Sequence, residues 1–232
     1  MLFRSMDMEI DSAAGDSDNP AITGETAASL KDSLGDINDQ VTRLTSLTND
    51  LVYLSRMEEA ENSLVMTELP LSEIVEETVS SFEPLAMEKG KLISSEIAPD
   101  VTVKGSSKEL EKLLSILLEN AVKYSLAPRE IPCGDDEDGM PLPPSINVEL
   151  RKEGRNAVLE VRNETESELT NESLSHVFER FYRTDSSRNS ATGGHGIGLS
   201  MAHAIVNVHG GKITARTSTG RDFIVTAVLP VV

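Results

Sequence analysis

Between residues 61 and 232, short strand-like patterns and amphipathic helix-like patterns follow one another without regular alternation. Alternating apolar and polar positions mark the strands, and apolar residues three and four positions apart mark the helices. A succession of this kind predicts an α+β fold. We expect a two-layer α/β sandwich, in which helices cover one face of a mixed sheet, preceded by a long N-terminal helix.

The individual elements can be placed by residue range. Strands are expected at 64–68, 91–97, 101–104, 145–152, 156–163, 212–217 and 223–229. Helices are expected at 71–88, from about 106 to 124, at 171–179 and at 197–208. Ser106 and Glu109 match the spacing of a capping box that would open the second of these helices. Polar loops are expected at 128–144 and 183–194.

A narrow apolar stripe with a seven-residue repeat precedes this region. Its members are Leu30, Leu34, Ile37, Val41, Leu44 and Leu51. Such a stripe belongs either to an amphipathic helix packed on its own domain or to a coiled-coil or bundle helix that pairs with a second chain. The narrow stripe favours pairing. Gly35 weakens the pattern, and Asp36 could cap a helix that begins there. Residues 1–24 are acidic, show no period and are expected to be disordered.

Composition excludes several function classes. The chain has 232 residues and a net charge of -18, which disfavours nucleic acid and anionic membrane surfaces as partners. Two acidic runs, at 1–40 and 129–141, carry much of that charge. The single cysteine, Cys133, rules out an intramolecular disulfide framework. The sequence contains no membrane-spanning segment or signal pattern, so a reducing, cytoplasmic setting is expected.

The first motif with chemical content ends the helix expected at 106–124. Asn120 lies three residues before Lys123 and four before Tyr124, so the three side chains can share a helix face. An amide oxygen can ligate a hard cation, and a lysine can meet a phosphate. By itself, this pattern is more typical of a solvated helix end.

Two further motifs follow. Glycines at 193, 194, 196 and 198 precede an apolar helix, where backbone N–H groups could approach phosphate oxygens. Their simpler interpretation is a tight turn. Phe178, Phe181 and Tyr182 stand close together and are followed by Arg183 and a polar run. The simpler interpretation of the aromatics is a core plug, and the polar run is typical of a mobile lid.

Taken in this order, the three motifs resemble those of one family. The chain resembles the catalytic half of a sensor histidine kinase of two-component signalling, in the ATPase superfamily shared with gyrase and the mismatch-repair ATPases. Residues 117–125 resemble its N box, 178–183 its F box and 194–199 its second glycine box. Residues 37–59 resemble the second helix of its dimerisation domain. The implied domains are a leader at 1–24, a partial dimerisation helix at 25–60 and an ATP-binding domain at 61–232.

The resemblance implies ATP and Mg²⁺ as cofactors. Asn120 would ligate Mg²⁺, Lys123 would contact a phosphate and Tyr124 would line the nucleotide site. Arg183 and Arg188 would lie in the lid near the phosphates. The second glycine box would supply backbone donors through Gly194, Gly196, Ile197, Gly198 and Leu199. The implied activity is transfer of the ATP γ-phosphate to a histidine on the dimerisation helices, for relay to a response regulator.

Two positions depart from the motifs of the family. Asn163 stands where the first glycine box has an aspartate that accepts from the adenine amino group, and no glycine follows it. A neutral acceptor binds more weakly than a charged one, so weakened ATP binding is expected. Ile116 stands where an upstream Asn often occurs and where gyrase-type relatives carry a catalytic Glu, so independent ATP hydrolysis is not expected.

The histidines form the larger departure. His176, His195, His203 and His209 all follow the region where the family's phosphoacceptor His is found, so this chain alone is not expected to autophosphorylate. It would act as the cytoplasmic part of a membrane-attached sensor that is a homodimer at full length. One alternative is a degenerate domain that regulates by pairing with other kinases. Another is an anti-sigma-type Ser/Thr kinase, which the long N-terminal helix disfavours.

Overall fold

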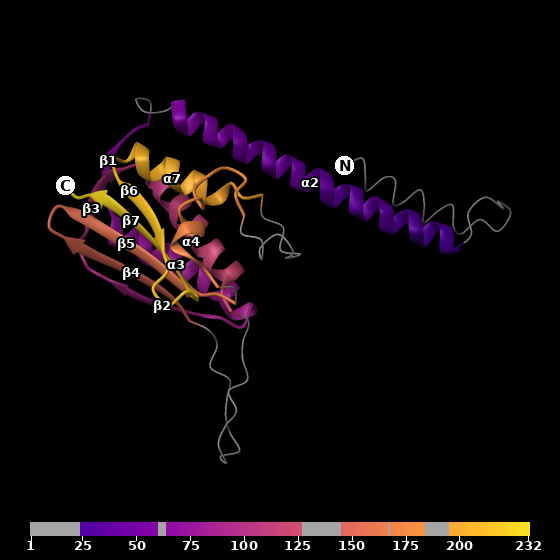
Figure 1. The fold of residues 1–232 in the computed structure, drawn as a ribbon. Helices are drawn as coiled ribbons and strands as arrows, with labels where there is room; N and C mark the ends of the chain where they lie inside the picture. The colour runs from indigo at the N-terminus through magenta and orange to yellow at the C-terminus, as the bar shows by residue number, and fades with distance from the viewer. Residues whose placement is uncertain (1–23, 60–63, 127–144, 167, 184–194) are drawn as a thin grey trace, which may run out of the picture. The chain divides into compact units, whose positions relative to one another are not determined.

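The computed structural model describes residues 24–59, 64–126, 145–166, 168–183 and 195–232. The chain divides into two units, Met1–Val52 and Tyr53–Val232, which are considered separately. Helix α2 (Gly24–Glu59) starts in the first unit and continues into the second. All other described elements belong to the second unit (Figure 1).

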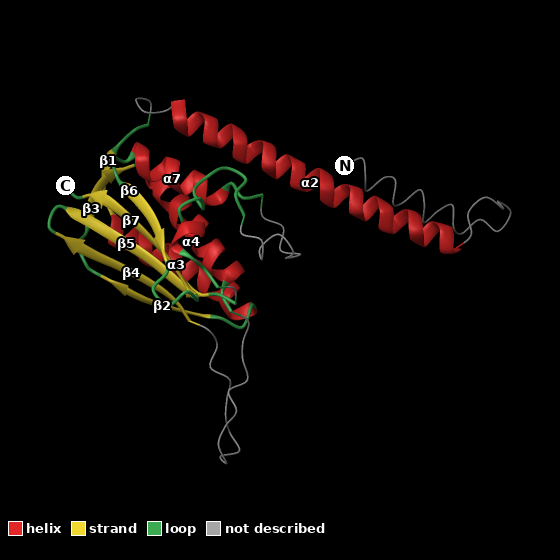
Figure 2. Cartoon of the chain, viewed as in Figure 1, coloured by secondary structure: helices red, strands yellow, loops and turns green. Residues whose placement is uncertain are grey.

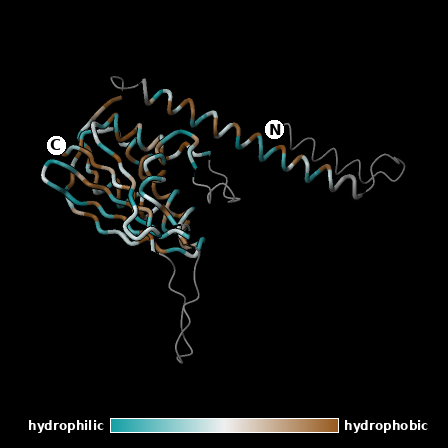
Figure 3. The backbone as a smooth tube through the Cα atoms, viewed as in Figure 1, coloured by the Kyte–Doolittle hydropathy of each residue, from teal (hydrophilic) through white to brown (hydrophobic). Residues whose placement is uncertain are grey.

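The described part of the first unit is helical. Helix α2 passes through Gly35 without a break, so the alternative start at Asp36 is not used. Apolar residues recur along the helix among hydrophilic ones (Figure 3), and Ile37 and Leu44 are exposed by 50% and 61%. Hydroxyl groups of Thr42, Thr45 and Thr48 donate to the carbonyl four residues earlier. The predicted long N-terminal helix is confirmed, and Leu30 and Val41 of its apolar stripe are exposed as well.

A five-stranded mixed sheet forms one layer of the second unit, with strand order β2-β4-β5-β7-β6 (Figure 2). Its strands are β2 (Leu92–Ile97), β4 (Ser145–Glu153), β5 (Asn156–Glu164), β6 (Lys212–Arg216) and β7 (Asp222–Pro230). Strands β2 and β4 are parallel, and the other pairs are antiparallel. Strands β1 (Thr67–Pro70) and β3 (Thr102–Gly105) form a separate antiparallel pair.

Helices α3 (Leu71–Glu88), α4 (Ser107–Tyr124) and α7 (Gly198–Val208) form the other layer, on one side of the sheet (Figure 1). Every second residue of β4 and β5 is buried over most of their length, as the period-two pattern requires, and Val158 of β5 is buried in addition. The alternate residues meet the apolar face of α4, which packs between α3 and α7. The core residues of α4 include Leu110, Leu113, Leu114, Leu117 and Leu118. The predicted α+β sandwich is confirmed.

Local boundaries differ from the predictions by more than one residue in two places. The first strand is Thr67–Pro70 and not 64–68, because its pairing partner β3 stands opposite those four residues. The predicted helix at 171–179 ends at Leu174, as α5 (Asn171–Leu174). Beyond it, the backbone N–H groups of Val177, Glu179 and Tyr182 bond three residues back and not four. Because this is the spacing of turns, the helix does not continue.

The predicted capping box at the start of α4 is wrong. The side chain of Ser106 makes no capping hydrogen bond. The backbone N–H of Ser106, which Glu109 would satisfy in such a box, instead donates to Nε2 of His209 at 3.1 Å. Glu109 is buried and accepts a hydrogen bond from the Tyr53 hydroxyl. A capping box is present one helix later, between Thr170 and Ser173. None of the helices in the described ranges has both the length and the apolar character needed to cross a bilayer.

Candidate functional site

The last turn of α4 carries the N-box residues. The apolar face of α4 packs in the core. Asn120, Lys123 and Tyr124 lie outside that buried face and remain partly exposed. Nζ of Lys123 lies 5.3 Å from the centroid of the Tyr124 ring, within the range of a cation–π contact. Lys123 and Tyr124 are therefore in contact at the C-terminal end of α4, and the joint role of the two with Asn120 stays a prediction. None of the three is locked inside the core.

Arg183, at the end of the F box, is a second cation close to Lys123. The pKa of Lys123 is lowered, first by burial and then by the positive charge of Arg183, while Glu119 opposes both effects. Two residues far apart in the chain are therefore close enough for their charges to repel. Bringing like charges together costs free energy, and an anion placed between them relieves that cost. The local field suits a phosphate even though the whole chain is acidic.

The glycine segment is tied to the F box through Gly196. This residue has φ +72, and a Cβ built on it would lie 2.8 Å from the carbonyl oxygen of Tyr182. The Gly196 carbonyl accepts from the N–H of Phe181 at 2.9 Å. Both the backbone angle and the close approach require glycine here. The second and third sequence motifs are therefore in direct backbone contact.

The same segment reaches the N-box helix through Gly198. Helix α7 begins at Gly198, and a Cβ there would lie 3.5 Å from Cγ2 of the buried Ile116 on α4. Ile197 is the N-cap and supplies no side-chain capping bond, and Leu199 is half-buried in the first turn. The first N–H groups of a helix have no intrahelical acceptors and favour an anion. The N-terminal end of α7 thus starts next to the N-box helix.

Asn163 lies on β5 and is only 2% exposed. Its Nδ2 donates to the carbonyl oxygen of Glu164 at 3.1 Å, so the amide is oriented with Nδ2 toward Glu164 and with the acceptor Oδ1 on its other side. The Leu126 N–H donates to the same carbonyl at 3.0 Å, so the end of β5 is joined to the chain leaving α4. Asn163 and Leu126, which follows the N box, therefore donate to the same carbonyl oxygen, and this hydrogen bond orients the Asn163 amide.

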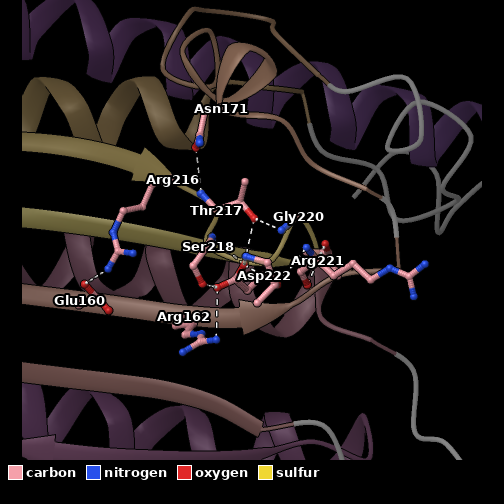
Figure 4. Close-up of polar contacts among 11 residues, drawn as sticks. Glu160, Arg162, Asn171, Arg216, Thr217, Ser218, Gly220, Arg221 and Asp222 are labelled. Atoms are coloured by element: carbon pink, nitrogen blue, oxygen red, sulfur yellow. Dashed lines mark hydrogen bonds and ion pairs between the residues drawn. The ribbon is translucent and has the colours of Figure 1, made fainter.

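The stretch after Asn163, which lacks the family's glycines, is held by backbone hydrogen bonds to another part of the chain. The Thr165 N–H donates to the Arg221 carbonyl at 2.8 Å, and the Leu169 N–H donates to the Gly220 carbonyl at 2.7 Å. Both acceptors belong to the β6–β7 turn, which is organised around the carboxylate of Asp222 (Figure 4). The sequence analysis did not single out Asp222. An aspartate after a Thr-Ser-Thr-Gly turn is the signal that could have done so.

Lys91 was also missed. It is only 7% exposed, and its Nζ donates to the carbonyls of Val122 and Ser125, the latter at 3.2 Å. Burial lowers the pKa of Lys91, the charge of Lys89 lowers it further, and Glu166 opposes both. Lys91 therefore holds the C-terminal carbonyls of the helix that presents the N box. In the sequence it follows Gly90 and resembles an ordinary surface lysine.

The remaining predicted residues, Arg188 and Gly194, lie outside the described residues. A cavity of about 450 Å³ is present elsewhere in the second unit, lined by residues that include Leu54, Met57, Phe178 and His203. It includes none of the predicted nucleotide residues. No group of three or more His, Cys, Asp or Glu side chains with metal-binding geometry occurs within the described ranges. A metal at Asn120 would therefore depend on oxygens of its ligand.

Comparisons with known proteins show the family to which the chain belongs. Residues 105–232 match the model of the family described as histidine kinase-, DNA gyrase B-, and HSP90-like ATPase. The sensor protein DltS of Streptococcus agalactiae serotype III (strain NEM316) is 30% identical over 182 residues, which cover 78% of this chain and 42% of DltS. The chain thus spans about two fifths of the length of that relative.

Solved structures share the fold. Acinetobacter baumannii histidine kinase AdeS aligns with a TM-score of 0.61 at 20% identity, over 98% of this chain and 94% of that one. Full-length ShkA, solved in complex with AMPPNP, aligns with a TM-score of 0.68 at 18% identity, over 99% of this chain and 44% of that one. Since the family model covers more than half of the sequence, the chain belongs to the histidine kinase-, DNA gyrase B- and HSP90-like ATPase family, and its ATPase domain is that of a sensor histidine kinase.

Proposed function

We propose that this chain is the ATP-binding catalytic core of a sensor histidine kinase. It transfers the γ-phosphate of ATP to a histidine on dimerisation helices, and that histidine passes the phosphate to a response regulator. The observation that carries the proposal is the approach of Lys123 and Arg183 from two distant motifs, together with the backbone contact between the F box and Gly196. Two cations from distant motifs suit the charge of a polyphosphate.

Each residue has a distinct role in this proposal. Lys123 and Arg183 bind phosphate oxygens, Tyr124 lines the nucleotide site, and Asn163 accepts from the adenine amino group through Oδ1. The first turn of α7 presents backbone N–H groups to the phosphates. Arg188 and Gly194 belong to the same site by resemblance.

Asn120 is the residue that would hold Mg²⁺. Its amide is partly exposed on the same end of α4 as Lys123, and an amide oxygen is a ligand that hard cations accept. The metal would neutralise phosphate charge, which is the main requirement of phosphoryl transfer. The protein itself contributes the positioning of the ligand and the cations on its other side.

The domain assignment follows from these roles. Residues 25–60 form a dimerisation-type helix and residues 61–232 the ATP-binding domain. The exposed apolar stripe of α2 supports pairing with dimerisation helices of an identical or related kinase. The full-length protein is then a homodimer whose cytoplasmic portion includes this chain. The complex of the structural neighbour ShkA with AMPPNP supports an adenine nucleotide as the ligand here.

Titration calorimetry with ATP, in the presence and absence of Mg²⁺, tests the proposal. The wild type should bind ATP more tightly with Mg²⁺, and Asn120→Ala should lose that metal dependence. Asn38→Ala, which removes an exposed amide from α2, is the matched control and should behave like the wild type. Unchanged affinity in Asn120→Ala would remove the metal assignment. Failure of the wild type to bind at millimolar ATP would refute the function and favour a domain that regulates by pairing.

A further inference from the structure

Asp222 is a buried carboxylate that accepts hydrogen bonds from three successive residues of the β6–β7 turn. It is 1% exposed at the first position of β7. Backbone N–H groups of Ser218 and Thr219 donate to Oδ1 at 2.9 and 2.7 Å. The hydroxyls of Thr217, Ser218 and Thr219 also donate to this carboxylate, and Arg162 forms an ion pair with it at 3.2 Å. The carboxylate therefore fixes the shape of the whole β6–β7 turn (Figure 4).

The charge on Asp222 is part of this arrangement. Burial alone would raise the pKa of Asp222, but the hydrogen bonds from Ser218 and Thr219 outweigh that effect and hold the pKa far below its ordinary value. Charged acceptors make stronger hydrogen bonds than neutral ones. Replacing the carboxylate with an amide would remove the charge and bring an NH₂ group toward groups that all donate.

The turn in its ordered form holds the segment that follows β5. Arg221 and Gly220 accept from the N–H groups of Thr165 and Leu169. The Thr217 N–H donates to Oδ1 of Asn171 at 3.2 Å, where α5 begins (Figure 4). The segment is thus tied to the turn near its start, in its middle and at its end. These hydrogen bonds hold a stretch of chain that contains no glycine of its own.

One peptide group connects the turn to the proposed base acceptor. The peptide between Glu164 and Thr165 donates through its N–H to the Arg221 carbonyl. Its carbonyl oxygen accepts from Nδ2 of Asn163 and from the Leu126 N–H. The β5–β7 register places Glu164 opposite Asp222 and Asn163 opposite Phe223. A shift of the turn would therefore rotate the peptide that orients the amide of Asn163.

We propose that Asp222 is a positioning residue for the base end of the nucleotide site, acting through the β6–β7 turn on the Asn163 amide. The proposal rests on the proposed function, since it assigns a base acceptor in that site. It makes Asp222 a determinant of selectivity for a purine with an exocyclic amino group. Asp222 does not touch the nucleotide; it fixes which end of the Asn163 amide faces the base.

Hydrogen exchange of the ligand-free protein tests the tether. Asp222→Asn should speed exchange of the Thr165 and Leu169 amides by about tenfold or more relative to the wild type, as loss of over one kcal/mol of local stability requires. Glu160→Gln is the matched control, because Glu160 lies on the same sheet and pairs with Arg216 without contacting the turn. Unchanged protection of both amides in Asp222→Asn would overturn the proposal. If Asp222→Asn does not fold, Ser218→Ala and Thr219→Ala remove single hydroxyl donors and should produce the same pattern in smaller amounts.

Calorimetry with two nucleotides tests the consequence for the site. ATP is compared with purine riboside triphosphate, which lacks the amino group. Asp222→Asn should weaken ATP binding by about fivefold to tenfold, the value of one hydrogen bond, and leave the analogue unaffected. In Asn163→Ala, the added substitution at Asp222 should have no further effect on ATP affinity.

The outcomes separate the two proposals. Equal losses for ATP and the analogue in Asp222→Asn would mean that Asp222 has only a structural role, and would overturn the inference alone. Additive losses in the double variant would do the same. A wild type that binds neither nucleotide would instead overturn the proposed function, and the base-positioning role with it, whatever the exchange experiment gives.

Discussion

Substitution of Gly196 by alanine should damage the domain far more than the same substitution two residues later. The Gly196 backbone has φ +72, and a new Cβ would lie 2.8 Å from the Tyr182 carbonyl oxygen and 2.9 Å from the Phe181 carbonyl carbon. Both neighbours are backbone atoms, which cannot rotate away as a flexible side chain could. Gly198 differs, because its new Cβ would make an ordinary contact at 3.5 Å with Ile116.

The size of the effect follows from two costs. Forcing a residue with a Cβ into the left-handed region costs about 1–2 kcal/mol. Displacing packed backbone to relieve the close contacts costs about 1–3 kcal/mol more. The loss in unfolding free energy should be about 2–5 kcal/mol, or a fall in Tm of roughly 5–15 °C for a domain of this size. Gly198→Ala should change stability by less than about 1 kcal/mol, and in the stabilising direction.

Thermal and urea unfolding followed by circular dichroism measure both variants against the wild type. Because Gly196 contacts the F-box backbone, Gly196→Ala should also weaken ATP binding at temperatures where it is folded. The reasoning would be refuted if Gly196→Ala matched the wild type in stability. It would equally be refuted if Gly198→Ala lost as much, because the cost would then be general to this segment and not due to the left-handed, close-packed position.

Three further predictions concern buried polar groups. Lys91→Met should lower the unfolding free energy by about 1–3 kcal/mol in urea titrations at neutral pH, because carbonyls at the end of α4 lose their donor. Because burial lowers the pKa of Lys91, the folded protein loses this proton at a lower pH than the unfolded chain does. The unfolding free energy of the wild type should therefore rise relative to that of Lys91→Met as pH increases toward about 10.4. A difference in unfolding free energy that does not change with pH would contradict this. His209→Leu should cost about 1–3 kcal/mol by removing the acceptor of the Ser106 N–H, and His209→Gln should recover part of it; equal losses would contradict this role. The depressed pKa of Asp222 contributes stability that is present above about pH 4 and is lost as pH falls. The difference in unfolding free energy between the wild type and Asp222→Asn should therefore become smaller in acid. A difference in unfolding free energy that does not change with pH would exclude that linkage.

Much of the fold could be predicted because local periodicity and burial agree. The alternating pattern of β4 and β5 has the inward positions that the structure buries, and the apolar face of α4 is the one in the core. The left-handed conformation of Gly196 likewise follows a glycine signal in the sequence. These features depend on near neighbours in the chain, which is why a single sequence is sufficient for them.

Competition between partners explains what could not be predicted. The spacing of Ser106 and Glu109 satisfies a capping box, yet His209 takes the Ser106 N–H and the Tyr53 hydroxyl takes Glu109. Both competitors come from other elements of the second unit. A local motif is only one of several ways to satisfy a backbone donor, and the packing of distant helices decides among them.

By itself, the sequence determined the elements, the order of three motifs and the residue types that suit a nucleotide. The tertiary structure alone decided that Lys123 and Arg183 approach each other, that Lys91 holds the end of the N-box helix, and that Asp222 holds the stretch after Asn163. Helical and strand periods are encoded within a few residues, whereas hydrogen bonds and charge repulsion depend on distances that exist only once the sheet and helices have packed.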